Sequence, residues 1–239
     1  ASFAFSHNNP VISALKKIKE TFPDLLVCCD VCLCSYTNHG HCGIVDKKGV
    51  IDHNKTNDIL CKIATTYAEA GADCIAPSAM IDGQVQTIRR ELDKQNLQDT
   101  LIMSYSSKFA SSFYSPFRAA SDCAPSFGDR STYQLPYNNV GSAIMESLID
   151  EQEGADILMV KPSLCYLDII SKIKDKTNSP LAVYNVSGEY AMLNVAAKNG
   201  CGNLKQMAKE STMAIFRAGA TICISYWANQ YNKIFTNLD

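Results

Sequence analysis

The sequence predicts an α/β protein built around a parallel β-sheet, and three observations support this prediction. One pattern recurs three times: an amphipathic helical stretch, then Gly-Ala-Asp or Gly-Ala-Thr, then a short apolar run. Helical and strand-like stretches alternate along the chain, as the crossover connections of a parallel sheet require. Polar residues collect directly after the strand-like runs, at the edge where α/β enzymes place their sites.

The elements follow in order from this pattern. The repeat glycines, Gly71, Gly154 and Gly219, suit the left-handed residue that ends a helix. The runs after them are too short for helices and largely apolar, which is typical of strands buried on both faces. The six expected strands are 74–76, 157–160, 222–224, 25–34, 101–105 and 181–186. The expected helices are 10–22, 55–70, 80–94, 142–153, 167–176 and 205–218.

Six parallel strands fit two architectures, an open doubly wound sheet or a (β/α)8 barrel of the TIM type that lacks two strands. No G-x-G-x-x-G or Walker motif follows a strand, which weakens the nucleotide-binding interpretation. No linker or low-complexity segment marks a boundary, so residues 1–239 are expected to form a single domain. The longest irregular stretch, 115–137, is a candidate active-site lid.

Composition and charge exclude several classes of protein. The 239 residues are 46% hydrophobic and 19% charged, which excludes disorder, collagen and coiled coil. The net charge of −2 and the lack of a basic run argue against binding to nucleic acid. No apolar stretch is long enough to span a membrane, and no signal peptide opens the chain. Eleven cysteines indicate reduced thiols in a cytosol-like compartment, some of them metal ligands.

Three cysteines form the first candidate site. Because side chains repeat every second residue in a strand, Asp30, Cys32 and Cys34 are expected to face the same way. The turn through 37–41 can return Cys42 to the same place. Three thiolates leave a tetrahedral zinc one open position, which is the catalytic kind of site. Three core cysteines in a cysteine-rich protein are the alternative.

Two lysines form the second candidate site, each just past an expected strand end. Lys108 follows 101–105 and Lys161 follows 157–160. Apolar neighbours leave such an amine poorly hydrated, and a second ammonium nearby adds to the effect, so the neutral form is favoured. A neutral amine is the nucleophile that Schiff-base chemistry with a ketone needs. A surface charge at the rim of the sheet is the alternative for either lysine alone.

Two further groups could bind carboxylates. Arg118, Arg130 and Gln134 lie in the 115–137 stretch and could clamp a substrate carboxylate bidentately. Solvated loop arginines are the alternative. Ser187 and Tyr226 follow strands and could donate to a second carboxylate, with strand-end capping and packing as the alternative.

The chain resembles the porphobilinogen synthase family, also called 5-aminolaevulinate dehydratase, over nearly its whole length. The matching stretches are DVCLCSYTNHGHCG, GADCIAPSAMIDG, YSSKFASSFYSPFR, FGDRSTYQ, GADILMVKP, VYNVSGEYAM and RAGATICISY. The resemblance implies a (β/α)8 barrel with an N-terminal arm. It also implies a hydro-lyase of haem biosynthesis, which condenses two molecules of 5-aminolaevulinate to porphobilinogen with loss of water.

The resemblance assigns roles to the candidate residues. Lys161 matches the lysine that holds the P-site substrate as a Schiff base, and Lys108 matches the A-site lysine. Asp30 is the candidate proton carrier, because it is expected to share a strand face with the metal ligands. The remaining matches are the catalytic zinc ligands Cys32, Cys34 and Cys42, the A-site carboxylate ligands Arg118, Arg130 and Gln134, the P-site carboxylate ligands Ser187 and Tyr226, the substrate-binding residues Phe117 and Tyr184, and the polar Ser78 near the reacting carbons.

The sequence also departs from the family. The family's Ser-Asp-Met-Met-Asp-Gly-Arg is Ser-Ala-Met-Ile-Asp-Gly-Gln at 78–84, so an Asp and an Arg are absent. Glu146 matches a glutamate associated with an allosteric magnesium, but Met145 stands where many relatives have Arg. These departures argue against an allosteric Mg²⁺. Family members have further N-terminal residues that hold the arm and the first two strands, so the chain is expected to be an N-terminally truncated barrel.

The expected function is therefore that of a zinc-dependent porphobilinogen synthase with 5-aminolaevulinate as its substrate. A catalytically inactive relative that acts as a structural or binding subunit is the alternative, and a Schiff-base lyase such as a class I aldolase is a third. The family implies a homo-oligomer, an octamer or a smaller assembly. The expected location is cytoplasmic, or the plastid if a transit peptide preceded Ala1.

Overall fold

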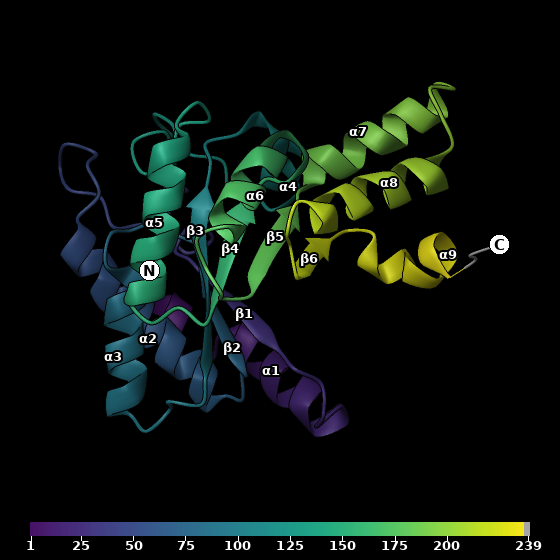
Figure 1. Cartoon of the computed structure of the whole chain (residues 1–239). Coiled ribbons are helices and arrows are strands. Elements are labelled where there is room, and N and C mark those ends of the chain that lie inside the picture. The colour runs from purple at the N-terminus through teal and green to yellow at the C-terminus, as the bar shows by residue number, and fades with distance from the viewer. Residues whose placement is uncertain (237–239) are drawn as a thin grey trace. The chain divides into compact units, whose positions relative to one another are not determined.

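The computed structural model of the chain describes residues 1–236, in which helices and parallel strands alternate (Figure 1). The strands follow one another in sequence order, and every registered pair of neighbours is parallel. The parallel α/β fold is therefore confirmed. The strands are β1 (Cys28–Val31), β2 (Cys74–Pro77), β3 (Leu101–Lys108), β4 (Ile157–Lys161), β5 (Leu181–Asn185) and β6 (Ile222–Ser225).

Each of the six expected helices is present, and residues 1–236 contain three more that the pattern did not indicate. The expected ones are α1 (Pro10–Thr21), α2 (His53–Glu69), α3 (Gln84–Lys94), α5 (Val140–Gln152), α6 (Leu167–Lys174) and α8 (Leu204–Arg217). The additional ones are α4 (Ser115–Ala120), α7 (Ser187–Lys198) and α9 (Tyr231–Phe235). Short 3-10 turns are η1 (Ser2–Phe5), η2 (Ser112–Tyr114), η3 (Leu164–Tyr166) and η4 (Ala228–Gln230). Within residues 1–236, no helix has both the length and the apolar character needed to cross a bilayer.

The chain divides into two compact units. The first contains residues 1–105, 123–134 and 149–157, and the second contains 106–122, 135–148 and 158–236. Strand β3 begins in the first unit and ends in the second. The single barrel domain over 1–239 stays a prediction, as does barrel closure.

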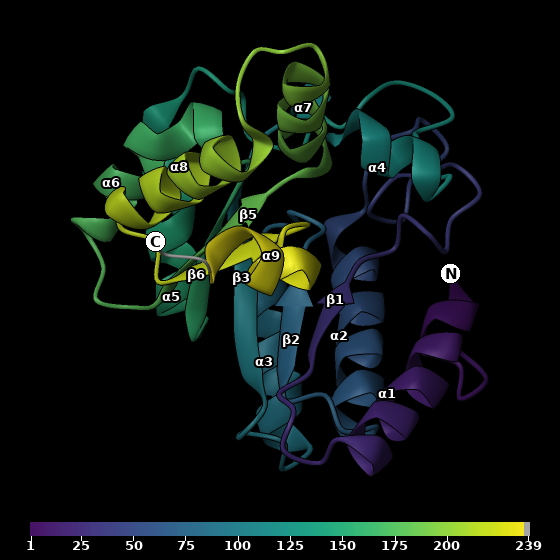
Figure 2. The same cartoon turned by 90° about the vertical axis from the view of Figure 1, so that its right-hand side faces the viewer.

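In the first unit, α2 packs on the strands because its apolar residues recur at helical spacing. Leu60, Ile63, Ala64 and Tyr67 are all buried, and they lie on one helical face. Figure 2 shows α2 next to β1 and β2. The side chain of Asp52 caps the helix by accepting a hydrogen bond from the Lys55 N–H at 3.0 Å.

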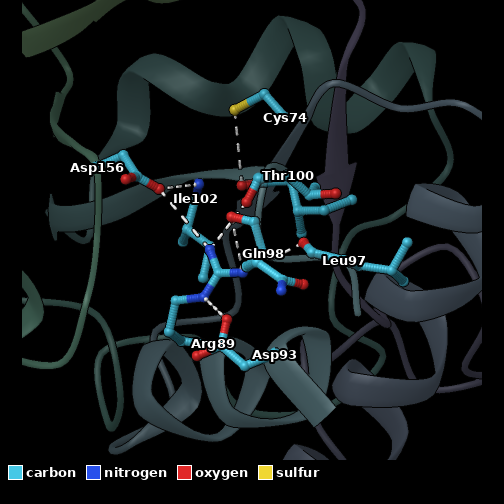
Figure 3. A network of polar contacts seen from close by, with 9 residues as sticks. Cys74, Arg89, Asp93, Leu97, Gln98, Thr100, Ile102 and Asp156 are labelled. Carbon is cyan, nitrogen blue, oxygen red and sulfur yellow. Dashed lines mark hydrogen bonds and ion pairs between the residues drawn. The ribbon is translucent and has the colours of Figure 1, made fainter. Parts of the chain in front are cut away.

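Arg89 of α3 holds the loop before β3 at the amino end of the sheet (Figure 3). Its Nη1 donates to the Thr100 carbonyl at 2.9 Å, and its Nε donates to Asp93 Oδ1 at 2.9 Å. Asp156, just before β4, accepts from the Ile102 N–H at 2.8 Å. This network lies at the edge opposite to the carboxyl strand ends, so we assign it to stability rather than chemistry.

The second unit is built on β4, β5 and β6. Leu158 pairs with Leu181, and Ala182 pairs with Ile222. Helices α7 and α8 run side by side in Figure 1 and contact each other. Trp227 is buried in a cluster with Ala208 of α8.

Three elements differ from the expected boundaries by three residues or more. Strand β1 ends at Val31 rather than at residue 34, because the chain turns and the Tyr36 N–H donates to the Leu33 carbonyl at 2.8 Å. Strand β3 continues to Lys108. Helix α3 starts after Gly83, whose φ of 71° lies in the left-handed region that favours glycine.

Candidate active site

The thiol cluster of the first unit lies just beyond β1. The sulfur atoms of Cys32, Cys34 and Cys42 all lie within 4.8 Å of one another, and those of Cys32 and Cys34 are 3.4 Å apart. The prediction that these cysteines meet is confirmed, but the strand alternation given as the reason for Cys32 and Cys34 is wrong. Because β1 stops at Val31, a turn rather than strand alternation brings the sulfurs together. The shared strand face that linked Asp30 to the thiols ends with the strand, and the Asp30 side chain is exposed.

The Cys42 side of this cluster is held by hydrogen bonds that involve the buried His41 and the half-buried Tyr133. The Cys42 N–H donates to Tyr133 Oη at 3.4 Å. The His41 ring lies between two partners, with Nδ1 3.1 Å from Tyr133 Oη and Nε2 3.0 Å from the Phe127 carbonyl. On the neighbouring strand, the N–H of the buried Ser78 donates to the Val31 carbonyl at 3.1 Å. Ser78 therefore follows the strand that flanks the cysteine turn.

Hydrogen bonds from the thiols of Cys123, Cys32 and Cys42, followed by burial, raise the pKa of the Cys34 thiol. Neutral thiols are thus favoured unless a cation balances the thiolates, and a bound metal is such a cation. The sequence reasoning missed Cys123. The only signal for it was its place in the 115–137 stretch, which also holds three predicted carboxylate ligands.

Arg130 and Gln134 lie on one turn of the first unit, where the Gln134 N–H donates to the Arg130 carbonyl at 2.8 Å. Arg130 is 7% exposed and Gln134 is 3% exposed. Burial acts to lower the pKa of Arg130, but electrostatic interaction with the neighbouring Cys42 and Cys34 outweighs it and raises that pKa. The Arg130 Nε and both amide atoms of Gln134 have no hydrogen-bond partner. Buried polar atoms left without partners indicate that a ligand completes them.

The two lysines lie on neighbouring strands in the second unit. The Phe109 N–H donates to the Lys161 carbonyl at 2.9 Å, and in a parallel ladder this bond places Lys108 beside Lys161. Register neighbours in a parallel sheet point to the same face from strands about 4.8 Å apart. The pairing of Val160 with Val183 extends this row to Tyr184. The Lys161 Nζ lies 4.0 Å from the centroid of the Tyr184 ring, a contact that attracts the charged ammonium. The neutral amine therefore stays a prediction.

Tyr114 connects the lysine row to the predicted carboxylate ligands and was missed by sequence reasoning. Its hydroxyl donates to the carbonyls of Phe109 at 2.7 Å and Lys161 at 3.1 Å. Its ring centroid lies 5.5 Å from the Lys161 Nζ and 5.3 Å from the Arg118 Cζ. The available signal was its position between Lys108 and Arg118 in YSSKFASSFYSPFR.

A pocket of about 570 Å³ lies between α4 and α7 in the second unit, and Phe117, Ser187 and Tyr226 contribute to its lining. This volume suits a small ligand. The Ser187 hydroxyl accepts from the Phe117 N–H at 3.1 Å and donates to the Phe113 carbonyl at 3.4 Å. Its capping contacts are thus present, and its role toward a carboxylate stays a prediction.

Glu189 holds the loops that follow β4 and β5 and was also missed. Its fully buried carboxylate accepts from the N–H groups of Ser163, Leu164 and Val186 at 3.0, 2.6 and 2.8 Å. Burial raises the pKa of Glu189, although these hydrogen bonds act against the shift. One side chain thereby fixes the turn after Lys161 and the start of α7.

The predicted site residues are distributed over both units. Arg118 of α4 belongs to the second unit, whereas Arg130 and Gln134 belong to the first, so their joint clamp on one carboxylate stays a prediction. Glu146 lies on α5 of the second unit, and the magnesium interpretation is likewise untested. The first unit holds Asp30, Cys32, Cys34, Cys42, Ser78, Arg130 and Gln134; the second holds Lys108, Lys161, Phe117, Arg118, Tyr184, Ser187 and Tyr226.

Paired lysines at the strand ends of a parallel α/β protein are typical of enzymes that bind carbonyl substrates as imines. Comparison with known proteins specifies the family. The profile of delta-aminolevulinic acid dehydratase matches residues 1–234. The dehydratase of Methanothermobacter thermautotrophicus is 51% identical over 228 residues, which cover 95% of this chain and 69% of the relative. That of Helicobacter pylori is 50% identical over 229 residues, which cover 96% of this chain and 71% of the relative. The chain belongs to the delta-aminolevulinic acid dehydratase family.

A solved structure supports the same assignment. The delta-aminolevulinic acid dehydratase of Toxoplasma gondii ME49, described in complex with the reaction product porphobilinogen, aligns with a TM-score of 0.95 at 44% identity. The alignment covers 97% of this chain and 66% of the Toxoplasma chain. The chain thus spans about two thirds of the length of that structure.

Proposed function

We propose that the chain performs the reaction of its family through Schiff bases on Lys108 and Lys161. That reaction is the condensation of two molecules of 5-aminolaevulinate to porphobilinogen with loss of water, and the enzyme class is lyase. The observation that carries the proposal is the register pairing of the two lysines on β3 and β4. Family membership over residues 1–234 supplies the substrate.

The lysine row accounts for the use of two substrate molecules. Each amine attacks a ketone carbonyl, water leaves, and the imine draws electrons from the adjacent carbon, which becomes more acidic. Two imines on register neighbours would hold the reacting molecules together, which replaces a collision in solution by a high effective concentration. Tyr114 and Tyr184 fix the Lys161 side of this arrangement.

The polar residues supply binding groups. We assign the unpartnered atoms of Arg130 and Gln134 to the carboxylate of the A-site substrate. Phe117, Ser187 and Tyr226, which line the second unit's pocket, are assigned to the P-site substrate. Asp30, two residues before Cys32, remains our candidate proton carrier.

The thiol cluster fits a zinc ion. Zinc–sulfur bonds of about 2.3 Å place tetrahedral sulfurs about 3.8 Å apart, and the three thiols lie within 4.8 Å of one another. We therefore propose Cys32, Cys34 and Cys42 as the ligands of a catalytic Zn²⁺. When bound, zinc would supply Lewis acidity or lower the pKa of a coordinated water.

We also extend three family properties to this chain as proposals. The six parallel strands are proposed to be six of the eight strands of a (β/α)8 barrel, and the enzyme is proposed to act as a homo-oligomer. Within the described residues none of the eleven cysteines forms a disulfide, which supports a reducing compartment, the cytoplasm or a plastid.

Borohydride trapping tests the proposed function. Reduction in the presence of 5-aminolaevulinate should attach substrate to Lys161 and Lys108, as located by peptide mass spectrometry. Lys161→Met should abolish the adduct on β4, while Lys176→Met, at an exposed position of the same unit, should leave trapping unchanged. Absence of an adduct on both lysines of the wild-type chain would refute the mechanism.

A further inference from the structure

A fourth thiol lies beside the cysteine triad of the first unit. Cys123 is 1% exposed and belongs to the segment 123–134, about 80 residues from the triad in sequence. Its thiol is hydrogen-bonded to the thiol of Cys34, which also contacts Cys32 and Cys42. Cys34 is therefore the centre of a cluster of four sulfurs, three of them within 4.8 Å of one another.

The fold fixes the segment that carries Cys123 against the loop that carries Cys42. The Arg130 Nη2 joins the two by donating to the carbonyls of Gly40 at 2.8 Å and Cys123 at 2.7 Å. The Ser126 N–H donates to the His39 carbonyl at 3.0 Å. The two backbones approach so closely that a Cβ on Gly40 would lie 2.5 Å from the Ala124 carbonyl oxygen. Backbone contacts of this kind place Cys123 reproducibly.

The charge around the cluster suits several thiolates. Arg130 is nine-tenths buried, its charge interacts with Cys42, Cys34 and Cys32, and its Nε has no acceptor. A buried guanidinium beside the cluster stabilises negative charge on the neighbouring sulfurs when the site is loaded. A fourth thiolate on a divalent cation supplies such charge.

We propose that Cys123 is the fourth ligand of the metal held by Cys32, Cys34 and Cys42, so that the loaded site is a tetrahedral centre of four sulfurs. The proposal rests on the proposed function, which supplies the thiophilic divalent cation. On loading, each thiol releases its proton, and metal–sulfur bonds replace the hydrogen bonds between thiols. Cys123, which now contacts the triad through Cys34, has to move until its sulfur lies about 3.8 Å from each of the other three sulfurs.

A site with four sulfurs is closed, whereas a site with three keeps a position for water or substrate. Cys123 therefore has to leave the metal before substrate oxygen can bind it. The segment 123–134 also carries Arg130 and Gln134, so binding of a carboxylate there is placed to pull on the same backbone that carries Cys123. With Cys123 as the fourth ligand, a coordination position on the metal would become available only when substrate binds.

X-ray absorption at the zinc edge of the zinc-loaded full chain tests the proposal. Wild type should show four sulfur neighbours at about 2.3 Å. Cys123→Ser should show three sulfurs and one oxygen or nitrogen, and should lose zinc to a chelator at least about tenfold faster. The control Cys165→Ser removes an exposed thiol of the second unit and should keep four sulfurs.

Three sulfurs and one lighter atom in wild type would overturn the assignment of Cys123 and leave the triad intact. A wild-type chain that binds no zinc would overturn both this assignment and the proposed zinc site. A Cys42→Ser variant that binds zinc as tightly as wild type would have the same consequence. The wild-type spectrum decides between these outcomes even if Cys123→Ser fails to fold.

Discussion

Gln134 illustrates how a single side chain can favour function over stability. Its amide is 3% exposed, and neither its oxygen nor its nitrogen has a hydrogen-bond partner. Burying such a group without hydrogen bonds lowers the stability of the ligand-free protein by about 1–3 kcal/mol. The fold tolerates this cost at a position where the substrate carboxylate is proposed to bind.

Gln134→Met tests this interpretation, since methionine has similar volume and no polar atoms. We expect the free energy of unfolding to rise by about 1 kcal/mol, because the unsatisfied amide is removed. The KM for 5-aminolaevulinate should rise about tenfold, the loss expected for one hydrogen bond to a charged group. Denaturant titration and steady-state kinetics measure the two effects.

The matched control is Gln98→Met at an exposed position of the same unit. It should change the free energy of unfolding by less than about 0.5 kcal/mol and leave KM unaltered. A Gln134→Met variant that is less stable than wild type would contradict the interpretation of Gln134 as an unsatisfied, ligand-ready group.

The residues found only in the structure have contacts far away in sequence. Cys123 meets Cys34, Tyr114 meets the Lys161 carbonyl, and Glu189 meets Ser163. Local pattern predicted the lysines and the triad because each follows a strand-like run directly. It contains no information on which distant thiol or carboxylate arrives beside them, since that depends on tertiary packing.

At the scale of elements, the apolar runs predicted all six strands, and the errors occur where another signal competes. Helix α7 was missed because it begins at Ser187 only two residues after β5 and carries exposed apolar side chains, Met192 and Val195 among them. Its pattern therefore does not show one apolar face. Strand β1 was extended to residue 34 because cysteine and leucine continue the apolar run past the turn.

The connection between α1 and β2 depends on one partly buried ion pair in the first unit. Asp73 Oδ2 lies 2.7 Å from the Lys19 Nζ and accepts from the Val27 N–H at 2.7 Å. Burial acts to raise the pKa of Asp73, but the hydrogen bonds from Lys19 and Val27 lower it below its ordinary value. Asp73 therefore links the helix, the segment before β1 and β2 in its ionised form.

Asp73→Asn should lower the free energy of unfolding by about 1 kcal/mol near pH 7. Because the folded pKa is depressed, this contribution is fully present above the ordinary value of 3.8 and is lost as the pH falls through the folded pKa. The difference between wild type and variant in denaturant titrations should therefore shrink below pH 3.8. A difference that stays constant from pH 7 to pH 3 would contradict the ionic role; Asp99→Asn, at an exposed position, is the control.

At the scale of the whole molecule, the two units are each assembled from discontinuous segments. The first takes in 123–134 and 149–157 from the middle of the chain, and β3 runs from one unit into the other. Units assembled from interleaved segments need no linker between them, so the absence of a linker is compatible with one domain and with two units. The sequence pattern therefore could not reveal this division.

Metal removal tests whether the units are energetically distinct. The proposed ligands Cys32, Cys34, Cys42 and Cys123 all belong to the first unit. A ligand that binds only the folded form stabilises what it binds by mass action, so zinc should slow amide hydrogen exchange around the cysteine loops at 32–42 and 123–134. Helix α8 of the second unit should exchange at the same rate with and without zinc. Equal slowing in both places would instead mean that the chain unfolds as one cooperative unit. The two units would then differ in their contacts but not in their stability.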